Sequence, residues 1–264
     1  MDNSFAMISE PTMRRTVDKV LGVPIDVVDW SNALNRVVAW SEANESRYVC
    51  ICNVHSVITA RRDAVFAKVV AESDMNTPDG APIAWMLRRD GYKGQQRING
   101  PDLMWQHAEI ASRLGHSIYL YGGTDETLDR LHEELLRAFP ALEIAGMYSP
   151  PFRKLSLDED NAAVERINAS GARVVWVGLG CPKQEGWMAA HRGRVNAVMI
   201  GVGAAFNYHA GELRRAPIWM RNLGLEWAFR LAHEPGRLAP RYIETNSLFI
   251  GLASLKFLKR FMRI

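Results

Sequence analysis

The chain has 264 residues, of which 48% are apolar, and its formal net charge is +3. This length allows one large domain or one domain with an appendage, and the composition is that of a globular protein with a sizeable core. The small basic excess is compatible with phosphate ligands or an anionic surface, and we expect no nucleic-acid partner.

The N-terminus and the cysteines indicate where the protein resides. Residues 1–16 contain charged side chains and no apolar run, so we expect no secretory signal. No segment reaches the length of a membrane span without charge. The three cysteines, Cys50, Cys52 and Cys181, show no disulfide, metal or redox spacing. We therefore expect buried free thiols and a cytoplasmic protein, with Cys50 and Cys52 on one face of a strand.

Short apolar runs that end in Gly, Pro or Asn alternate with helical patterns along most of the chain. The predicted strands are residues 47–52, 117–121, 143–147, 173–179 and 197–202. The predicted helices include residues 56–71, 81–89 and 125–139 and one that follows Pro182. This alternation predicts an α/β fold with a Rossmann-like, mainly parallel sheet and helices on both faces.

The strand pattern stops at Arg214, and the rest of the chain has helical patterns. We expect an α/β catalytic domain over residues 1–212 and a helical C-terminal appendage over residues 213–264.

Ligands of open α/β sheets bind beyond the carboxyl ends of the strands, and this rule selects several loops. Residues 122–124, Gly-Gly-Thr, are explained equally well by phosphate contact or by a tight turn with a threonine N-cap. Residues 201–205 match a dinucleotide fingerprint only in part, because the third glycine is missing. That mismatch argues against a nucleotide-dependent oxidoreductase.

Residues 178–185 follow a predicted strand and contain two glycines and a proline, and then Lys183 and Gln184 in the first turn of a predicted helix. A lysine there is unfavourable beside the positive end of the helix dipole unless an anion lies nearby. Gln184 could hydrogen-bond a base or a sugar. A well-formed helix start is the alternative interpretation.

Asp79 lies between Pro78 and Gly80, in a loop that holds its carboxylate rigidly. It could cap the helix over residues 81–89 or act as a general base. Local sequence alone favours the cap.

The acidic triplet of residues 158–160 superficially matches the carboxylates with which sugar transferases hold a metal–nucleotide. It follows Ser156, however, and acids suit the first turn of a helix. We therefore predict no metal site there. The histidines have no ligand spacing, although His209 falls within the predicted site.

The segment 247–264 has a basic face. On a helix, Lys256, Lys259, Arg260 and Arg263 fall within roughly one third of the circumference, with apolar residues elsewhere. A basic amphipathic helix suits an anionic membrane interface. A packed terminal helix or an oligomer contact are the alternatives.

Taken together, the ordered motifs from about residue 48 to residue 242 resemble the WecG/TagA/CpsF family of bacterial glycosyltransferases. The motifs are Asn53-Val54-His55, Thr77-Pro78-Asp79-Gly80, Arg97-Ile98-Asn99-Gly100-Pro101-Asp102, Tyr121-Gly122-Gly123, residues 178–185, residues 201–206, Arg215-Ala216-Pro217, and Gly224-Leu225-Glu226-Trp227 with Arg230, Glu234-Pro235 and Arg237.

The resemblance implies an inverting transferase that acts in bacterial surface polysaccharide biosynthesis without a metal or another cofactor. It would move a sugar from a UDP-sugar donor to a polyprenyl-diphosphate-linked acceptor, as a peripheral protein on the inner face of the cytoplasmic membrane. By position, Asp79 matches the proposed catalytic base. The donor or nucleotide positions are Asn53, Gly122, Gly123, Gly180, Gln184, Gly203 and Asn207. The acceptor or diphosphate positions are Arg97, Asn99, Asp102, Arg214, Arg215, Arg230, Arg237 and Arg241.

The chain departs from the family pattern at Asn207, Cys181 and Ile51, where many members have Asp, Ser and Thr. The donor sugar, the acceptor glycan and the oligomeric state, a homo-oligomer included, stay open. A non-enzymatic lipid-phosphate-binding scaffold is the alternative function. It explains the basic C-terminus but not the polar loops at the strand ends.

Overall fold

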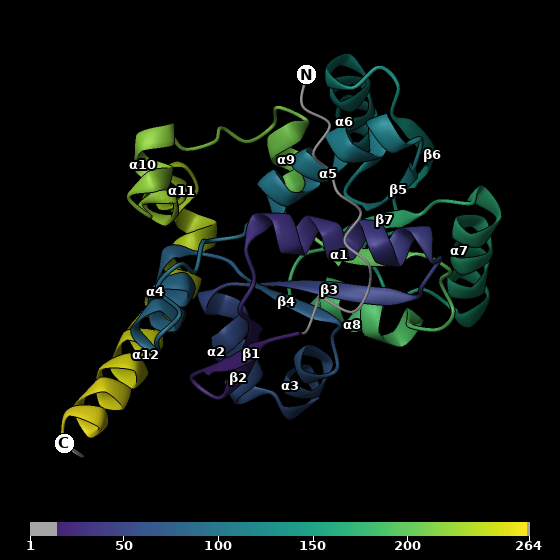
Figure 1. Ribbon diagram of the computed structural model, residues 1–264. Helices are drawn as coiled ribbons and strands as arrows, with labels where there is room; N and C mark the ends of the chain where they lie inside the picture. Colours follow the sequence, from purple (N-terminus) through teal and green to yellow (C-terminus); the bar gives the residue numbers. More distant parts are fainter. Residues whose placement is uncertain (1–14, 263–264) are drawn as a thin grey trace, which may run out of the picture.

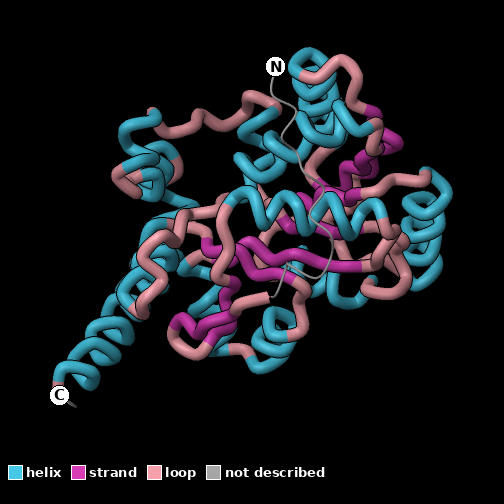
Figure 2. Tube along the Cα trace, viewed as in Figure 1, coloured by secondary structure: helices cyan, strands magenta, loops and turns pink. Residues whose placement is uncertain are grey.

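Six strands form one parallel sheet in the order β4-β3-β8-β7-β5-β6 (Figure 1). They are β3 (Arg47–Cys52), β4 (Met75–Pro78), β5 (Ser117–Gly122), β6 (Glu143–Tyr148), β7 (Val174–Gly178) and β8 (Val198–Gly201). Figure 2 shows the sheet between helical layers, so the predicted α/β class with a parallel sheet is confirmed.

The computed structural model describes residues 15–262. Residues 1–14 lie outside the described residues, and most of the expectation of no secretory signal rests on them. Arg263 of the predicted basic face also lies outside the described residues. The side chains of Arg237, Arg241 and Arg260 also lie outside the described part.

Both faces of the sheet are apolar, as expected for a parallel sheet covered on both sides. In β3, Tyr48, Cys50 and Cys52 enter one core cluster, whereas Val49 and Ile51 enter the other. Cys50 and Cys52 are buried free thiols on one face, as predicted, while Cys181 is partly exposed.

Helices cover both faces of the sheet. One core cluster contains residues of α1 (Trp30–Glu42), α5 (Gly100–Leu114), α6 (Asp125–Ala138) and α9 (Ala205–His209). The other contains residues of α2 (Val54–Arg62), α3 (Ala64–Ala71), α7 (Leu157–Ser170) and α8 (Lys183–His191).

The single helix predicted over residues 56–71 is wrong, because the segment divides at Asp63. The Asp63 side chain accepts hydrogen bonds from the backbone N–H groups of Val65 and Phe66 and so caps α3.

The strand β4 and the N-terminal hairpin were not apparent from sequence patterning. The hairpin pairs β1 (Val17–Val20) with β2 (Val23–Asp26). Buried Asp26 joins it to the sheet, because its carboxylate accepts from Arg15, from Arg36 and from the backbone N–H of Asn76 in β4. Residues 77–80 were expected to be a loop, yet Thr77 and Pro78 end a buried strand.

The C-terminal segment contains α10 (Ile218–Asn222), α11 (Glu226–His233) and α12 (Pro235–Phe261), which agrees with the predicted helical appendage. The domain boundary at residues 212 and 213 stays a prediction. The appendage approaches the helix α4 (Ala81–Arg89) closely, since a Cβ at Gly224 would lie 2.5 Å from that of Ala81.

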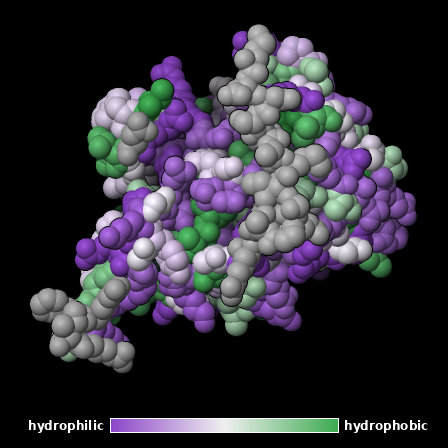
Figure 3. Space-filling view, in the orientation of Figure 1, coloured by the Kyte–Doolittle hydropathy of each residue, from purple (hydrophilic) through white to green (hydrophobic). Residues whose placement is uncertain are grey.

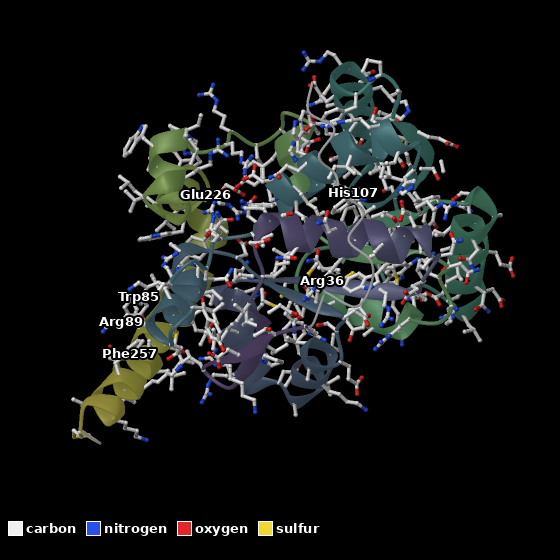
Figure 4. The ribbon with its side chains drawn as sticks, in the orientation of Figure 1. Arg36, Trp85, Arg89, His107, Glu226 and Phe257 are labelled. Atoms are coloured by element: carbon white, nitrogen blue, oxygen red, sulfur yellow. The ribbon has the colours of Figure 1, made fainter. Side chains whose placement is uncertain are left out.

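The helix α12 is anchored on the α/β body. Phe249 and Ala253 are buried in a core cluster. Phe257 packs edge-on against Trp85 of α4, with ring centroids 5.1 Å apart, and Arg89 lies over both rings (Figure 4). Lys256 Nζ pairs with Asp90 Oδ2 at 2.5 Å. One member of the predicted basic membrane face is therefore engaged within the protein.

Among the described residues, no helix is both long and apolar enough to cross a bilayer.

Candidate active site

Asp79 follows the end of β4 and lies next to the end of β3. Its backbone N–H donates to the carbonyl of Cys52, at 2.9 Å, which links the two strand ends. The cap interpretation is wrong, because Gly80 occupies the N-cap position of α4 and no side chain caps the helix. Gly80 has a φ of +82°, a conformation that glycine adopts without strain, so the chain can turn into α4 without help from the Asp79 carboxylate.

Burial raises the pKa of Asp79 to about 6, with Arg97 opposing this shift and Glu226 adding to it. A hydrogen bond from the Gly80 backbone and the charge of Arg230 also favour the ionised form. A carboxylate with a pKa near the working pH can accept a proton and still be ionised before the reaction. This electrostatic setting suits a general base.

A large cavity, of about 1430 Å³, lies beyond the ends of β5, β7 and β8. Its lining includes four predicted donor residues, Gly123, Gly180, Gly203 and Asn207. Its volume exceeds that of most small-ligand pockets, so a nucleotide sugar would fit.

One wall of this large cavity is aromatic. Trp187 stacks between Tyr121 and His191, with centroid distances of 4.3 and 4.2 Å. Lys183 also lines the cavity from the first turn of α8. A flat apolar surface beside a cation is a suitable environment for a base or sugar that carries phosphate.

Gln184 lies beneath the glycine loops rather than on the cavity surface. Its side-chain carbonyl accepts from the backbone N–H groups of Gly180 and Gly203, at 3.1 and 3.0 Å. Its amide donates to Glu185, whose carboxyl is buried. Gln184 therefore fixes the separation of two loops that line the large cavity.

Asn207 lines the large cavity together with Glu212, which sequence reasoning missed. The Asn207 amide donates to one Glu212 oxygen at 2.7 Å, and the Thr127 hydroxyl donates to the other at 2.8 Å. Each carboxylate oxygen can accept a second bond, so Glu212 can still accept from a ligand hydroxyl or N–H group.

A second cavity, of about 450 Å³, lies between α4, α10 and the start of α5. Three predicted acceptor residues, Arg97, Asn99 and Asp102, line it, and Arg88, Arg221 and Trp30 line it as well. The structure thus gathers part of the predicted donor set around one cavity and part of the acceptor set around another.

Asn99 and Asp102 bind the appendage. Asn99 caps α5 by accepting from the Asp102 backbone N–H, and its amide donates to the Asp102 carboxylate at 2.7 Å. Asp102 pairs with Arg215 at 2.6 Å. Although burial opposes it, the hydrogen bond from Arg215 lowers the pKa of Asp102. These contacts hold the start of the appendage against the strand ends.

The other predicted appendage arginines occupy different environments. Arg230 lies over the Tyr208 ring at 5.6 Å, and burial raises the pKa of that tyrosine to about 12. Arg214 is exposed and lines neither cavity. Arg237 and Arg241 belong to α12, but their side chains are outside the described part.

The remaining predicted glycine and asparagine lie at strand ends. At Gly122 a Cβ would lie 2.7 Å from the Gly178 backbone, so the ends of β5 and β7 require this glycine. Asn53 directly follows β3 and caps α2, because its side-chain oxygen accepts from the Ser56 backbone N–H.

Two other sequence features have structural roles. The acidic triplet belongs to a capping box formed by Ser156 and Glu159 at the start of α7, as the helix-start interpretation predicts. His209 stacks on Trp105 and contacts the Pro101 carbonyl, so it supports the packing of α9 on α5. No group of three potential metal ligands occurs among the described residues.

Sequence reasoning missed Glu226 as a charge partner of the site. Glu226 projects from α11 toward the body of the molecule (Figure 4) and pairs with Arg97 at 3.0 Å. Its place in the motif Gly224-Leu225-Glu226-Trp227 was the available signal, but a motif does not say which distant residue a side chain meets.

Comparison with known protein families identifies the family of the chain. The family model described as "Glycosyl transferase WecG/TagA/CpsF family" matches residues 18–263, which is nearly the whole chain and extends beyond the motif-bearing region at both ends. The chain is therefore a member of the WecG/TagA/CpsF family of glycosyltransferases.

Proposed function

We propose that this glycosyltransferase moves a sugar from a UDP-sugar to a polyprenyl-diphosphate-linked acceptor, with inversion at the anomeric carbon. The observation that supports this most directly is the position of Asp79. It is a partly buried carboxylate with a pKa near 6, and the charges of Arg97, which lines the smaller cavity, and of Arg230 in the appendage both act on it.

In the proposed reaction, an acceptor hydroxyl oxygen attacks the anomeric carbon as its proton passes to Asp79. A bond forms between that oxygen and the anomeric carbon. The bond from the anomeric carbon to the UDP phosphate oxygen breaks, and its electron pair leaves with UDP. One displacement of this kind inverts the anomeric configuration. General base catalysis contributes about 100-fold to 10,000-fold in rate.

The donor would occupy the large cavity. Lys183 at the start of α8 offers a cation to the diphosphate, and the glycine loops at Gly180 and Gly203 let the ligand approach the backbone closely. A fixed cation of this kind can stabilise the charge that develops on departing UDP. Glu212, held by Asn207 and Thr127, can accept from a ribose or sugar hydroxyl.

The acceptor would enter from the smaller cavity. Arg97 and Arg215 are paired with Glu226 and Asp102. Arg88, by contrast, donates to the Gln95 carbonyl, and no carboxylate partner of Arg88 occurs among the described residues. Arg221 lies 3.8 Å from Asp102, which Arg215 already neutralises, and its Nε has no hydrogen-bond partner. The charges of Arg88 and Arg221 are therefore the ones available to an acceptor diphosphate.

A membrane-facing surface would explain the exposed apolar side chains of the appendage. Ile218, Trp219, Leu223 and Trp227 are exposed on α10, α11 and the turn between them, where Figure 3 shows hydrophobic residues at the surface. Along α12, Ile243, Ile250, Leu255, Leu258 and Met262 are exposed. At 100° per residue these five fall within an arc of about 140°. We propose that this apolar surface, together with Lys259, places the protein on the inner face of the cytoplasmic membrane.

The function is tested by offering the purified protein a panel of UDP-sugars with short-chain polyprenyl-diphosphate sugars in detergent. We expect transfer from one donor, with an inverted anomeric configuration determined by NMR. Retention of configuration would contradict single displacement. UDP-sugar and acceptor binding without any turnover would favour the lipid-phosphate scaffold.

Membrane placement requires substitutions rather than truncation, because removing α12 would also remove the core residues Phe249 and Ala253. The variant Ile250→Ser/Leu258→Ser should float less with anionic liposomes than the wild type. Val65→Ser, which removes an exposed apolar side chain of α3, is the control. Equal flotation of the double variant and the wild type would oppose the proposal.

A further inference from the structure

The ion pair between Arg97 and Glu226 joins the catalytic loops to the appendage. Arg97 precedes α5, and Glu226 is the first residue of α11. Their side chains are 19% and 17% exposed, and Arg97 Nη2 lies 3.0 Å from Glu226 Oε2. A pair that is this well shielded from water interacts more strongly than an ordinary surface ion pair.

The appendage is fixed at this point by the backbone as well. Gly224, two residues before Glu226, lies directly against Ala81, the first residue of α4. Asp79 and Gly80 lie between the end of β4 and the start of α4. The start of α11 and the loop of Asp79 are therefore held close by the packing of Gly224 against the Ala81 side chain and by the ion pair.

Three charged side chains are among the leading influences on the pKa of Asp79: Arg97, Glu226 and Arg230. Behind them, the Cys52 thiol is buried and neutral, since burial raises its pKa. Two of the three charges, those of Glu226 and Arg230, come from α11.

We propose that Glu226 is a positioning residue for the transfer reaction, which holds Arg97 beside Asp79 and prevents Arg97 from pairing with it. When Glu226 is paired with Arg97, the Asp79 carboxylate can accept the proton of the acceptor hydroxyl. When the appendage is not seated, Arg97 can pair with Asp79 and the base is weaker. This inference rests on the proposed role of Asp79 as the base.

The pH dependence of kcat/KM separates this role from a merely structural one, because its acid limb reports the base of the free enzyme. In wild type the limb should lie near pH 6. Glu226→Gln removes a negative charge and frees Arg97, and an unshared cation lowers the pKa of a neighbouring carboxylate by about 1–3 units. We expect the acid limb to move down by about one pH unit and kcat/KM at pH 8 to fall by up to about tenfold.

Two further variants sharpen the test. Glu226→Asp keeps the charge and should restore the acid limb toward its wild-type position. Glu244→Gln removes a carboxylate of α12 that pairs with Arg62 at the surface, and its profile should match the wild type. An acid limb that stays in place in Glu226→Gln, whatever the loss of rate, would overturn the inference.

Failure of the proposed function gives a different result. If Asp79 is not the base, Asp79→Asn retains an acid limb near pH 6. If Asp79 is the base and only the Glu226 inference fails, the limb disappears in Asp79→Asn but does not move in Glu226→Gln.

Discussion

The contact between Gly224 and Ala81 provides a way to unseat the appendage without touching a catalytic side chain. Gly224 has a φ of +73°, and an added Cβ would lie 2.5 Å from the Ala81 side chain. In Gly224→Ala, the left-handed conformation costs about 1–2 kcal/mol. Overpacking against Ala81 adds about 1–3 kcal/mol. A strain of about 2 kcal/mol already changes an equilibrium roughly 30-fold, so α10 and α11 should lift from the start of α4.

Transfer activity and limited proteolysis together measure this effect. We expect kcat/KM of Gly224→Ala to fall at least about tenfold, as Glu226 and Arg230 leave Asp79. We expect cleavage within residues 213–234 to become faster, while UDP binding stays measurable. Gly251→Ala is the matched control, because a Cβ there meets nothing within 4 Å and alanine favours a helix by about 0.5–1 kcal/mol. A Gly224→Ala protein as active and as protease-resistant as wild type would refute this reasoning.

Three other substitutions test separate parts of the account. Asp26→Ala removes the carboxylate that pairs with buried Arg36, so urea unfolding should show that the free energy of unfolding falls by about 3–5 kcal/mol. A fall of less than about 1 kcal/mol would contradict the role of this pair. Burial lowers the pKa of His107 to about 3, so the unfolded chain binds a proton that the folded chain does not, and stability is lost as pH falls below about 6.5. His107→Leu should therefore flatten the stability–pH curve by about 1.4 kcal/mol per pH unit between pH 6 and 4, and an unchanged slope would show that His107 is not buried in its neutral form. Gln184→Leu leaves the N–H groups of Gly180 and Gly203 without their shared acceptor, so the Kd for UDP should rise about tenfold in calorimetry. An unchanged Kd would show that the two loops do not need this bridge.

Much of the fold could be predicted because its strands are continuous apolar runs. The segments around Val49, Leu120, Val175 and Met199 are buried on both faces, and sequence patterning found all four strands. The strand β4 was missed because Met75-Asn76-Thr77-Pro78 looks polar. Its Asn76 side chain is nevertheless buried, where its amide donates to the carbonyls of Pro24 and Val70. A polar residue satisfied by distant backbone has no local signature.

The site was predictable in its positions but less so in its contacts. The rule that ligands bind beyond the strand ends selected the loops of Asp79 and Gly180, and these residues do follow β4 and β7 in the structure. The actual partner of Arg97 is Glu226, which comes from the far end of the chain, and no periodic pattern predicts such a pair. Asp79 was favoured as a cap because acids suit helix starts, but Gly80 takes the cap position through its backbone conformation.

The central claim is that Asp79 removes the proton of the acceptor hydroxyl. The most direct measurement compares transfer turnover and UDP-sugar affinity in Asp79→Asn and in wild type, over a pH range that includes 6. The account predicts a loss of turnover of about 100-fold or more, loss of the acid limb, and a donor Kd within a few-fold of wild type. Turnover near the wild-type value, with the acid limb retained, would contradict it.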